Sequence, residues 1–218
     1  MHIYEGVLAG TTAGKEVLLA GAAAAAVGTA IGLYKLDYER IPRAAVLSSV
    51  FFVVSLIHVP LGLAAVHLTL NGLMGLILGW AIFPAVLIAL LLQSIFCPLY
   101  GGMTTLGLNT LVMALPGVVC YYLFRRPAHG GSERVVFAAG MAAGATGILL
   151  GALLVGASLA AAGKPFEAIG AAFLIAHLPL AAAEGLVTAS VVVSLRKICP
   201  ELLAAPLLVT AGEEGSRG

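Results

Sequence analysis

The first residues of the chain, "MHIYEG", place a histidine directly after Met1. A free α-amine, the amide nitrogen of residue 2 and the His2 imidazole would close fused chelate rings on one metal ion, with three nitrogens in one plane. A fourth nitrogen completes a square, which suits Ni(II) or Cu(II). The dipeptide alone favours a simpler interpretation, a polar residue at a terminus, because short motifs match by chance. The large His2 side chain disfavours removal of Met1, so we expect the mature chain to begin there, without a cleaved signal.

Two further histidines are candidates for the fourth nitrogen. His67 stands in "VHLTLNG" and His58 in "LIHVPLG", both beside apolar segments. A histidine inside or at the edge of a membrane is a functional candidate. A histidine that only bonds a backbone carbonyl is about as common in a helix bundle. Both histidines therefore stay open as the fourth ligand.

A third group of polar residues lies in apolar surroundings. His177 and Glu184 in "AHLPLAAAEGLVTAS" are seven residues apart, two helical turns, and share one helix face. Glu184 should face the bundle interior, either as a hydrogen-bonding post between helices or in a transport or catalytic role. On the first interpretation Glu184→Gln leaves metal affinity nearly unchanged. Gln93, Thr104 and Asn109 flank a glycine-rich segment and would hold irregular backbone in place.

The elements that must position these residues are transmembrane helices. Of 218 residues, 61% are apolar and 10% are charged, whereas an average soluble domain is nearer half apolar and about a quarter charged. The composition predicts an all-α, polytopic membrane bundle. A net charge of +1 without long basic runs excludes nucleic acid as an expected partner. The three cysteines are far apart and indicate neither a disulfide framework nor a thiolate metal site: Cys97, Cys120 and Cys199.

About seven apolar segments are long enough to cross a membrane within a bundle. The segment 97–110, "CPLYGGMTTLGLNT", is too polar to face lipid and is expected to re-enter the membrane or line a cavity. Residues 1–200 read as one domain, and 201–218 as a partly disordered tail. The predicted spans are 17–34, 44–59, 67–83, 84–96, 111–124, 135–162 and 168–195.

The basic residues predict an orientation. Seven alternating spans leave only Lys15 and Lys164 on one side, and the richer side should be cytoplasmic. The N-terminus is then extracellular or periplasmic. The residues on the cytoplasmic side are Lys35, Arg40, Arg43, Arg125, Arg126, Arg134, Arg196 and Lys197.

Four segments, in this order and spacing, resemble the CbiM/NikM family: "MHIYEG", "VHLTLNGLMGLILG", "LLLQSIFCPLYGGMTTLGLNTLVMALPG" and "AHLPLAAAEGLVTASVV". Members of that family are the substrate-specific S components of energy-coupling factor (ECF) transporters for cobalt and nickel. The resemblance runs from residue 1 to about 197. It implies a seven-helix bundle whose N-terminus tucks into the outer part of the bundle and supplies the metal ligands.

The resemblance implies specific ligands: the Met1 amine nitrogen, the backbone and imidazole nitrogens of His2, and the His67 imidazole. Glu5 would orient the His2 ring. The family's glycine-rich loop "GG-x-x-x-LG-x-N", which would pack over the terminus with Gln93 nearby, corresponds here to Gly101, Gly102, Gly107 and Asn109. The chain has "YEG" where many members have Pro-Asp-Gly or Pro-Glu-Gly, and "LGLAAV" where many have Gly-Gly or Gly-Ser ahead of the second histidine. His58 therefore remains the alternative to His67.

The implied function is the substrate-capture subunit of an ATP-driven ECF importer in a prokaryotic cell membrane. Co²⁺ or Ni²⁺ would be its transported substrate, with no bound cofactor. The chain has no G-x-x-x-x-G-K-[ST] motif, so ATP hydrolysis needs partners. These would be a transmembrane coupling (T) subunit, two ATPase subunits or domains, and a small CbiN/NikN-like membrane subunit.

Two questions stay open. A planar four-nitrogen site favours nickel, whereas "VHLTLNG" looks more like the cobalt members of the family. The competing function is an intramembrane metal-dependent enzyme that uses His177 and Glu184. Against that function, the sequence contains no H-E-x-x-H or G-x-S-x-G motif.

Overall fold

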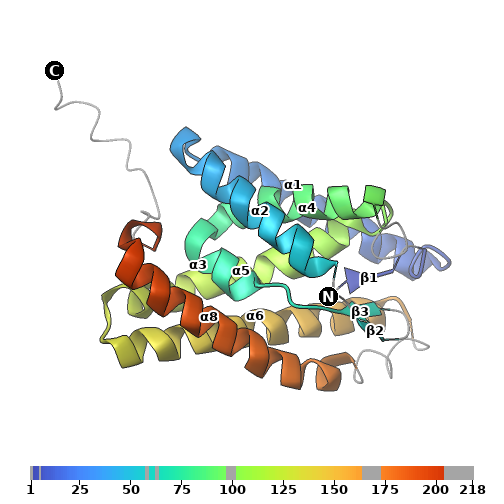
Figure 1. Ribbon diagram of the computed structural model, residues 1–218. Coiled ribbons are helices and arrows are strands. Elements are labelled where there is room, and N and C mark those ends of the chain that lie inside the picture. Colours follow the sequence, from blue (N-terminus) through green and yellow to red (C-terminus); the bar gives the residue numbers. More distant parts are fainter. Residues whose placement is uncertain are drawn as a thin grey trace.

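The computed structural model describes residues 2–4, 6–56, 59–61, 64–96, 102–163 and 173–203, with the backbone alone at 2, 59–61 and 64–66. This part of the chain is almost entirely helical (Figure 1), which confirms the all-α class. The helices are α1 (Thr12–Tyr34), α2 (Ile41–Ser55), α3 (Asn71–Leu78), α4 (Ile82–Phe96), α5 (Leu106–Gly130), α6 (Glu133–Ala161) and α8 (Leu178–Ile198). Three short strands, β1 (His2–Ile3), β2 (Val59–Leu61) and β3 (Ala64–Val66), form one small sheet that the sequence does not predict.

Five segments are long and apolar enough to span a membrane, so the chain is a multi-pass membrane protein. They are Thr12–Tyr34, Asn71–Phe96, Leu106–Gly130, Glu133–Ala161 and Phe173–Ile198. The second of them is interrupted by a 3-10 turn at Gly79–Ala81, where Gly79 has φ +55°.

Contacts on either side of that turn show that the chain reverses there. Gly75 and Gly79 pack beside Gly117 and Tyr121, so α3 runs parallel to α5. Ser48 Oγ donates to Ala85 O (2.7 Å), and Gln93 Nε2 donates to Ser55 O (3.5 Å), so α4 runs parallel to α2. These contacts agree with the predicted division at Pro84 between two segments. The count of seven crossings stays a prediction.

Close helix contacts make the inner part of the bundle rigid. A Cβ added at Gly75 would lie 2.1 Å from Gly117 O, and one added at Gly144 would lie 2.5 Å from Glu184 O. Only a residue without a side chain permits these approaches, as is typical of membrane helices. Helices α3 and α8 are thereby held against α5 and α6, and these elements carry the polar residues described below.

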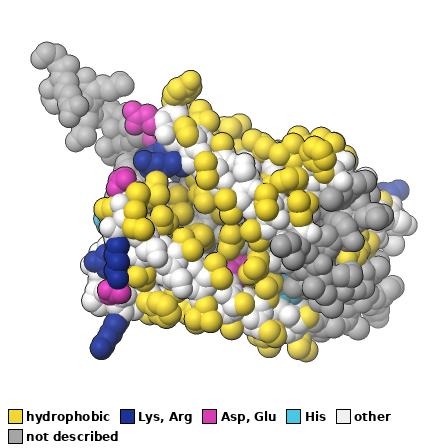
Figure 2. Space-filling model, in the orientation of Figure 1, with side chains coloured by type: hydrophobic (Ala, Val, Ile, Leu, Met, Phe, Trp, Pro, Cys, Tyr) yellow, Lys and Arg dark blue, Asp and Glu magenta, His cyan; other side chains and the backbone are white. Residues whose placement is uncertain are grey.

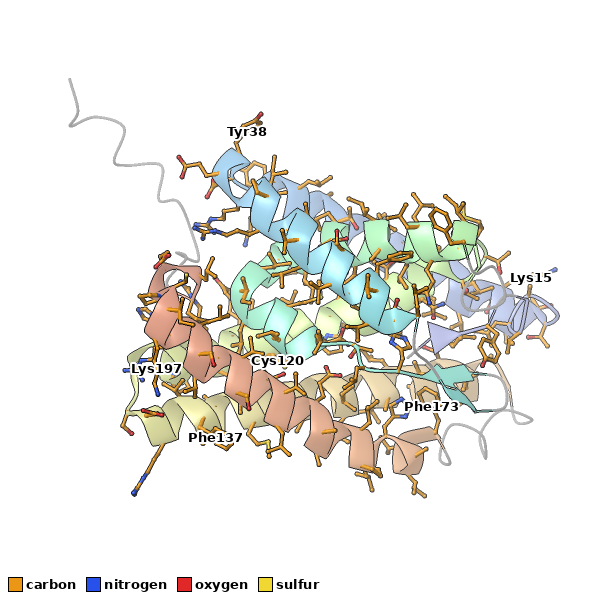
Figure 3. The ribbon with its side chains drawn as sticks, viewed as in Figure 1. Lys15, Tyr38, Cys120, Phe137, Phe173 and Lys197 are labelled. Atoms are coloured by element: carbon orange, nitrogen blue, oxygen red, sulfur yellow. The ribbon has the colours of Figure 1, made fainter. Side chains whose placement is uncertain are left out.

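The two ends of the bundle differ in charge. Tyr38 and Lys197 lie at one end and Lys15 at the other (Figure 3). Figure 2 shows the lysine and arginine side chains of this face gathered mainly at the first of these ends. The Lys35 ammonium there lies 5.5 Å from the centre of the Trp80 ring, an arrangement typical of a membrane interface. This distribution matches the predicted grouping of basic residues; the assignment of that end to the cytoplasm stays a prediction.

Some predicted boundaries are wrong. The second helix ends at Ser55 rather than near residue 59, and the third begins at Asn71 rather than at His67. The reason is the small sheet: residues 59–61 and 64–66 pair with each other, so a helix cannot continue through them. Residues 97–101 of the predicted re-entrant loop and the tail from residue 204 lie outside the described residues.

Candidate metal-binding site

The N-terminus enters the protein as a strand. In the sheet order β1-β3-β2, all pairs are antiparallel, and the register places His2 opposite Ala65 and Ile3 opposite Ala64. Pro60, which lacks an N–H donor, lies in the edge strand β2, where such a residue is tolerated. His2 therefore has its backbone opposite a residue only two positions before His67.

Asn109 holds the other side of β1. Its side-chain Oδ1 accepts from Ile3 N–H (2.9 Å), and its Nδ2 donates to Ile3 O (3.0 Å). The amide thus bonds both backbone groups of Ile3, as a neighbouring strand would. Nδ2 also donates to Thr105 Oγ1 (3.1 Å), which fixes the orientation of the Asn109 amide. Both Asn109 and Ile3 are buried, so the backbone next to His2 is fixed by β3 on one side and α5 on the other.

His67 directly follows β3 and is 3% exposed. Its Nδ1 lies 2.8 Å from Leu68 O. A carbonyl only accepts, so Nδ1 carries the hydrogen, and in the neutral ring Nε2 is then the unprotonated nitrogen, the one of the two that can bond a metal. Phe51 packs edge-on against the ring, with centroids 6.3 Å apart. A histidine ligand is commonly oriented in this way, by a hydrogen bond from its second ring nitrogen.

Glu184 holds the segment that follows His67. The carboxylate is fully buried and accepts hydrogen bonds from Thr69 N–H (2.8 Å), Asn71 N–H (3.1 Å) and Thr69 Oγ1 (3.2 Å). Asn71 is the first residue of α3, and the residue before it, Leu70, provides no side-chain cap. Glu184 on α8 therefore serves as the N-terminal cap of α3, and the predicted inward orientation is confirmed.

His177 is also fully buried, as its helix-face spacing from Glu184 predicts. Its Nδ1 lies 2.6 Å from Phe173 O, and the Phe173 ring packs on it with centroids 4.1 Å apart. Phe173 marks this position in Figure 3, at the opposite end of the bundle from Lys197. The Nε2 atom of His177 has no hydrogen-bond partner within the described part of the chain. An acid–base pair would require a hydrogen bond or ion pair between His177 and Glu184. None joins these two described residues.

The remaining predicted site residues are placed as follows. Gln93 is buried near the end of α4, where its Nε2 donates to Ser55 O. Gly102 O accepts from Thr105 Oγ1 (3.3 Å), so the loop supports Asn109 indirectly. Within the described residues, no three His, Cys, Asp or Glu side chains group around one point. Predicted residues that lie outside the described residues are Met1, Glu5, His58 and Gly101, and the His2 side chain is outside them too.

Sequence reasoning missed three contributors. Thr69 and Asn71 supply the donors to Glu184, and the only sequence signal for them is that two polar residues interrupt the apolar run "HLTLNGLMG". Ile3 is the third missed residue: its buried backbone is the partner of Asn109 and anchors the N-terminal strand. An isoleucine at position 3 carries no distinguishing signal.

The family model for CbiM, the "Cobalt uptake substrate-specific transmembrane region", matches residues 2–202. The chain belongs to the CbiM family. This CbiM-family chain is a membrane transport component of the CbiM type.

Its relatives carry transport names. A putative metal transport protein of Haemophilus influenzae is 42% identical over 207 residues, covering 93% of this chain and 97% of that protein. The fused nickel transport protein NikMN of Rhodobacter capsulatus is 34% identical, over 94% of this chain and 64% of that protein. The cobalt transport protein CbiM of Geobacter sulfurreducens is 30% identical, over 99% of this chain and 65% of that protein. This CbiM-family chain therefore spans slightly less than two thirds of the last two proteins.

Two crystal structures titled as transition metal transporters share the fold. One has a TM-score of 0.72 at 22% identity, covering 91% of this chain and 93% of its own. The other, a truncated transporter, has a TM-score of 0.68 at 21% identity, covering 92% of this chain and 99% of its own. The fold of the CbiM-family chain is thus shared over nearly its full length.

Proposed function

We propose that this chain is the substrate-capture subunit of an ATP-driven ECF importer and that it binds Co²⁺ or Ni²⁺ through its own N-terminus. The ligands are the Met1 amine, the His2 backbone and imidazole nitrogens, and His67 Nε2. The observation that carries the proposal is the docking of β1, because Asn109 and β3 fix the backbone at residue 3 and place His2 opposite the strand that leads into His67.

The chemistry of the donors fits the substrate. Four nitrogens in a plane suit Ni(II), and imidazole and amine nitrogens also bind Co(II). His67 Nδ1 bonds Leu68 O, and we assign the other ring nitrogen, Nε2, to the metal. Glu5 is assigned to orient His2, while Gly101 and Gly102 shape the loop over the terminus. His58 is the alternative fourth ligand.

The partners follow from what this chain lacks. It has no phosphate-binding Walker A motif, so a transmembrane coupling subunit and two ATPase subunits or domains would drive transport. A relative named as a fused NikMN protein supports a small NikN-like membrane subunit as another partner. The basic end of the bundle is assigned to the cytoplasm and the end with β1 to the outside, where the metal arrives.

The proposal is tested by extending the chain by one residue before Met1. The extension converts the amine into an amide and displaces the terminal chelate ring, so high-affinity binding of Ni²⁺ and Co²⁺ should be lost. The control carries the same residue at the C-terminus. Calorimetry on both purified proteins decides the question, and equal affinities would refute a site that uses the terminal amine.

A further inference from the structure

We propose that Glu184 positions His67 for metal binding by fixing the backbone of residues 69–71 from the opposite helix. The inference rests on the proposed function, because it concerns the same metal site. It assigns the buried carboxylate neither a catalytic role nor a place among the metal ligands.

The segment that carries His67 has little structure of its own. Residues 67–70 connect β3 to α3 and belong to neither. Leu70 has φ +51° and is the one non-glycine residue with positive φ in the described part of the chain. A leucine adopts this conformation only where the surroundings enforce it. Something outside the segment must therefore hold it.

Glu184 supplies the contacts that do so. Both carboxylate oxygens are used, Oε2 by Thr69 N–H (2.8 Å) and Oε1 by Asn71 N–H (3.1 Å), on either side of Leu70. Thr69 Oγ1 lies within hydrogen-bond distance of both oxygens, at 3.2 and 3.4 Å. Hydrogen bonds from backbone N–H groups at a helix N-terminus to a carboxylate are among the stronger ones in proteins. Leu70 is thus clamped between two charge-assisted bonds.

The clamp reaches His67 through two residues of chain. His67 Nδ1 bonds Leu68 O, and Leu68 is followed by Thr69, whose N–H and hydroxyl both bond Glu184. A shift of Thr69 therefore moves the carbonyl that orients the His67 ring. Metal–nitrogen bonds tolerate deviations of only about 0.2 Å, so a small shift is sufficient to weaken the site.

A carboxylate, rather than any polar group, is needed here. Two backbone N–H groups approach two different oxygens, so an amide at position 184 would place its NH₂ group against one N–H donor. Glu184→Gln keeps the size of the side chain and removes one of the two acceptors. It therefore tests the clamp without opening a cavity.

The experiment compares Ni²⁺ binding by the purified full-length protein and its Glu184→Gln variant, by calorimetry and by the visible spectrum of the bound ion. Affinity should fall by roughly 10–100-fold, the loss typical when the group that orients a ligand is removed. The spectrum should change, because ring orientation alters the ligand field. The matched control is Thr188→Val, one turn further along α8, whose Oγ1 is buried and unpartnered among the described residues. It should leave both readouts unchanged.

A second variant, Thr69→Val, keeps the proposal testable if the Glu184→Gln variant does not fold. Thr69→Val removes only the hydroxyl donor and keeps the N–H bond, so it should weaken binding several-fold in the same direction. If the folded Glu184→Gln variant binds with wild-type affinity and spectrum, the proposal is overturned. If the Glu184→Gln variant does not fold, unchanged binding by the Thr69→Val variant overturns the proposal. If the wild type itself binds no metal, or if the chain extended before Met1 binds equally well, the proposed function fails instead.

Discussion

Replacing Asn109 with alanine should release the N-terminal strand from the bundle. The substitution removes the two hydrogen bonds that the Asn109 amide makes to Ile3, at 2.9 and 3.0 Å. Each net hydrogen bond contributes about 0.5–1.5 kcal/mol, so docking of β1 should weaken by about 1–3 kcal/mol. The upper half of that range is expected, because Ile3 is fully buried and its two backbone groups would be left without the Asn109 amide while β1 stays docked.

The effect on metal binding follows from the population of the docked strand. Apparent affinity is the intrinsic affinity multiplied by the fraction of protein in the binding-competent state. If docking is only marginally favourable in the metal-free protein, a loss of 1–3 kcal/mol lowers Ni²⁺ affinity by roughly 5–150-fold. Asn109→Asp should resemble alanine, because a carboxylate still accepts from Ile3 N–H but repels Ile3 O.

Two measurements check this prediction together. Calorimetry gives the Ni²⁺ affinity, and hydrogen exchange at the Ile3 amide gives the stability of docking, which should fall even where affinity changes little. The control is the neighbouring Thr110→Val. Thr110 is equally buried, but its hydroxyl donates to Leu106 O within the same helix (2.8 Å). If the Asn109→Ala variant keeps both wild-type Ni²⁺ affinity and wild-type hydrogen exchange at Ile3, Asn109 does not hold β1 in place and the prediction is refuted.

Three other predictions address the ligands and the scaffold. His2→Ala and His67→Ala should each lower metal affinity by orders of magnitude; normal binding by His67→Ala with loss in His58→Ala would move the fourth ligand to His58. Affinity should fall as pH drops from about 8 to 6, by roughly tenfold per unit for the amine alone, because an α-amine with a pKa near 7.7–8.0 must lose its proton to bind; a pH-independent titration would argue against nitrogen donors. Gly75→Ala should destabilise the protein by about 1–3 kcal/mol, because its Cβ would lie 2.1 Å from Gly117 O; an unchanged melting temperature in detergent would contradict that close packing.

The sequence predicts the helical part of the fold well, because membrane-spanning helices are long and apolar, and both properties can be read directly from the sequence. A division of the segment 71–96 at Pro84 is also predictable, because proline suits the first turn of a helix, and the structure has the break a few residues earlier, at Gly79–Ala81. The small sheet does not follow. Its strands are two or three residues long, and "VPLGLAAV" lacks the alternation of polar and apolar residues that indicates a half-buried strand.

Asn109 shows what sequence reasoning retrieves at the site and what it leaves out. Its polarity in an apolar segment indicates a structural task, and its match to the family loop suggests that it packs over the terminus. Its partner is not deducible, because Ile3 lies 106 residues away and offers only backbone atoms. Any residue except proline presents the same N–H and C=O groups, so the pairing is a property of the fold.

At Glu184 our proposal differs from the expectation drawn from the sequence. From the sequence, a buried hydrogen-bonding post would make Glu184→Gln nearly neutral for metal affinity. The structure agrees that Glu184 is such a post, but its partners are Thr69 and Asn71, in the segment that leads from His67 into α3. On our proposal, a structural role and a functional role are not alternatives at this position.

The candidate site is held together by groups that belong to different helices. Asn109 on α5 fixes β1 from one side, β3 pairs with it on the other, and Glu184 on α8 fixes the segment that continues from β3 through His67. A site built on a chain terminus would ordinarily be mobile, because terminal residues have few contacts. Here Asn109 holds the backbone of Ile3 and β1 pairs with β3, so part of the ordering entropy of this strand is lost on folding rather than on metal binding. Such preorganisation favours the high affinity that the proposed capture function requires.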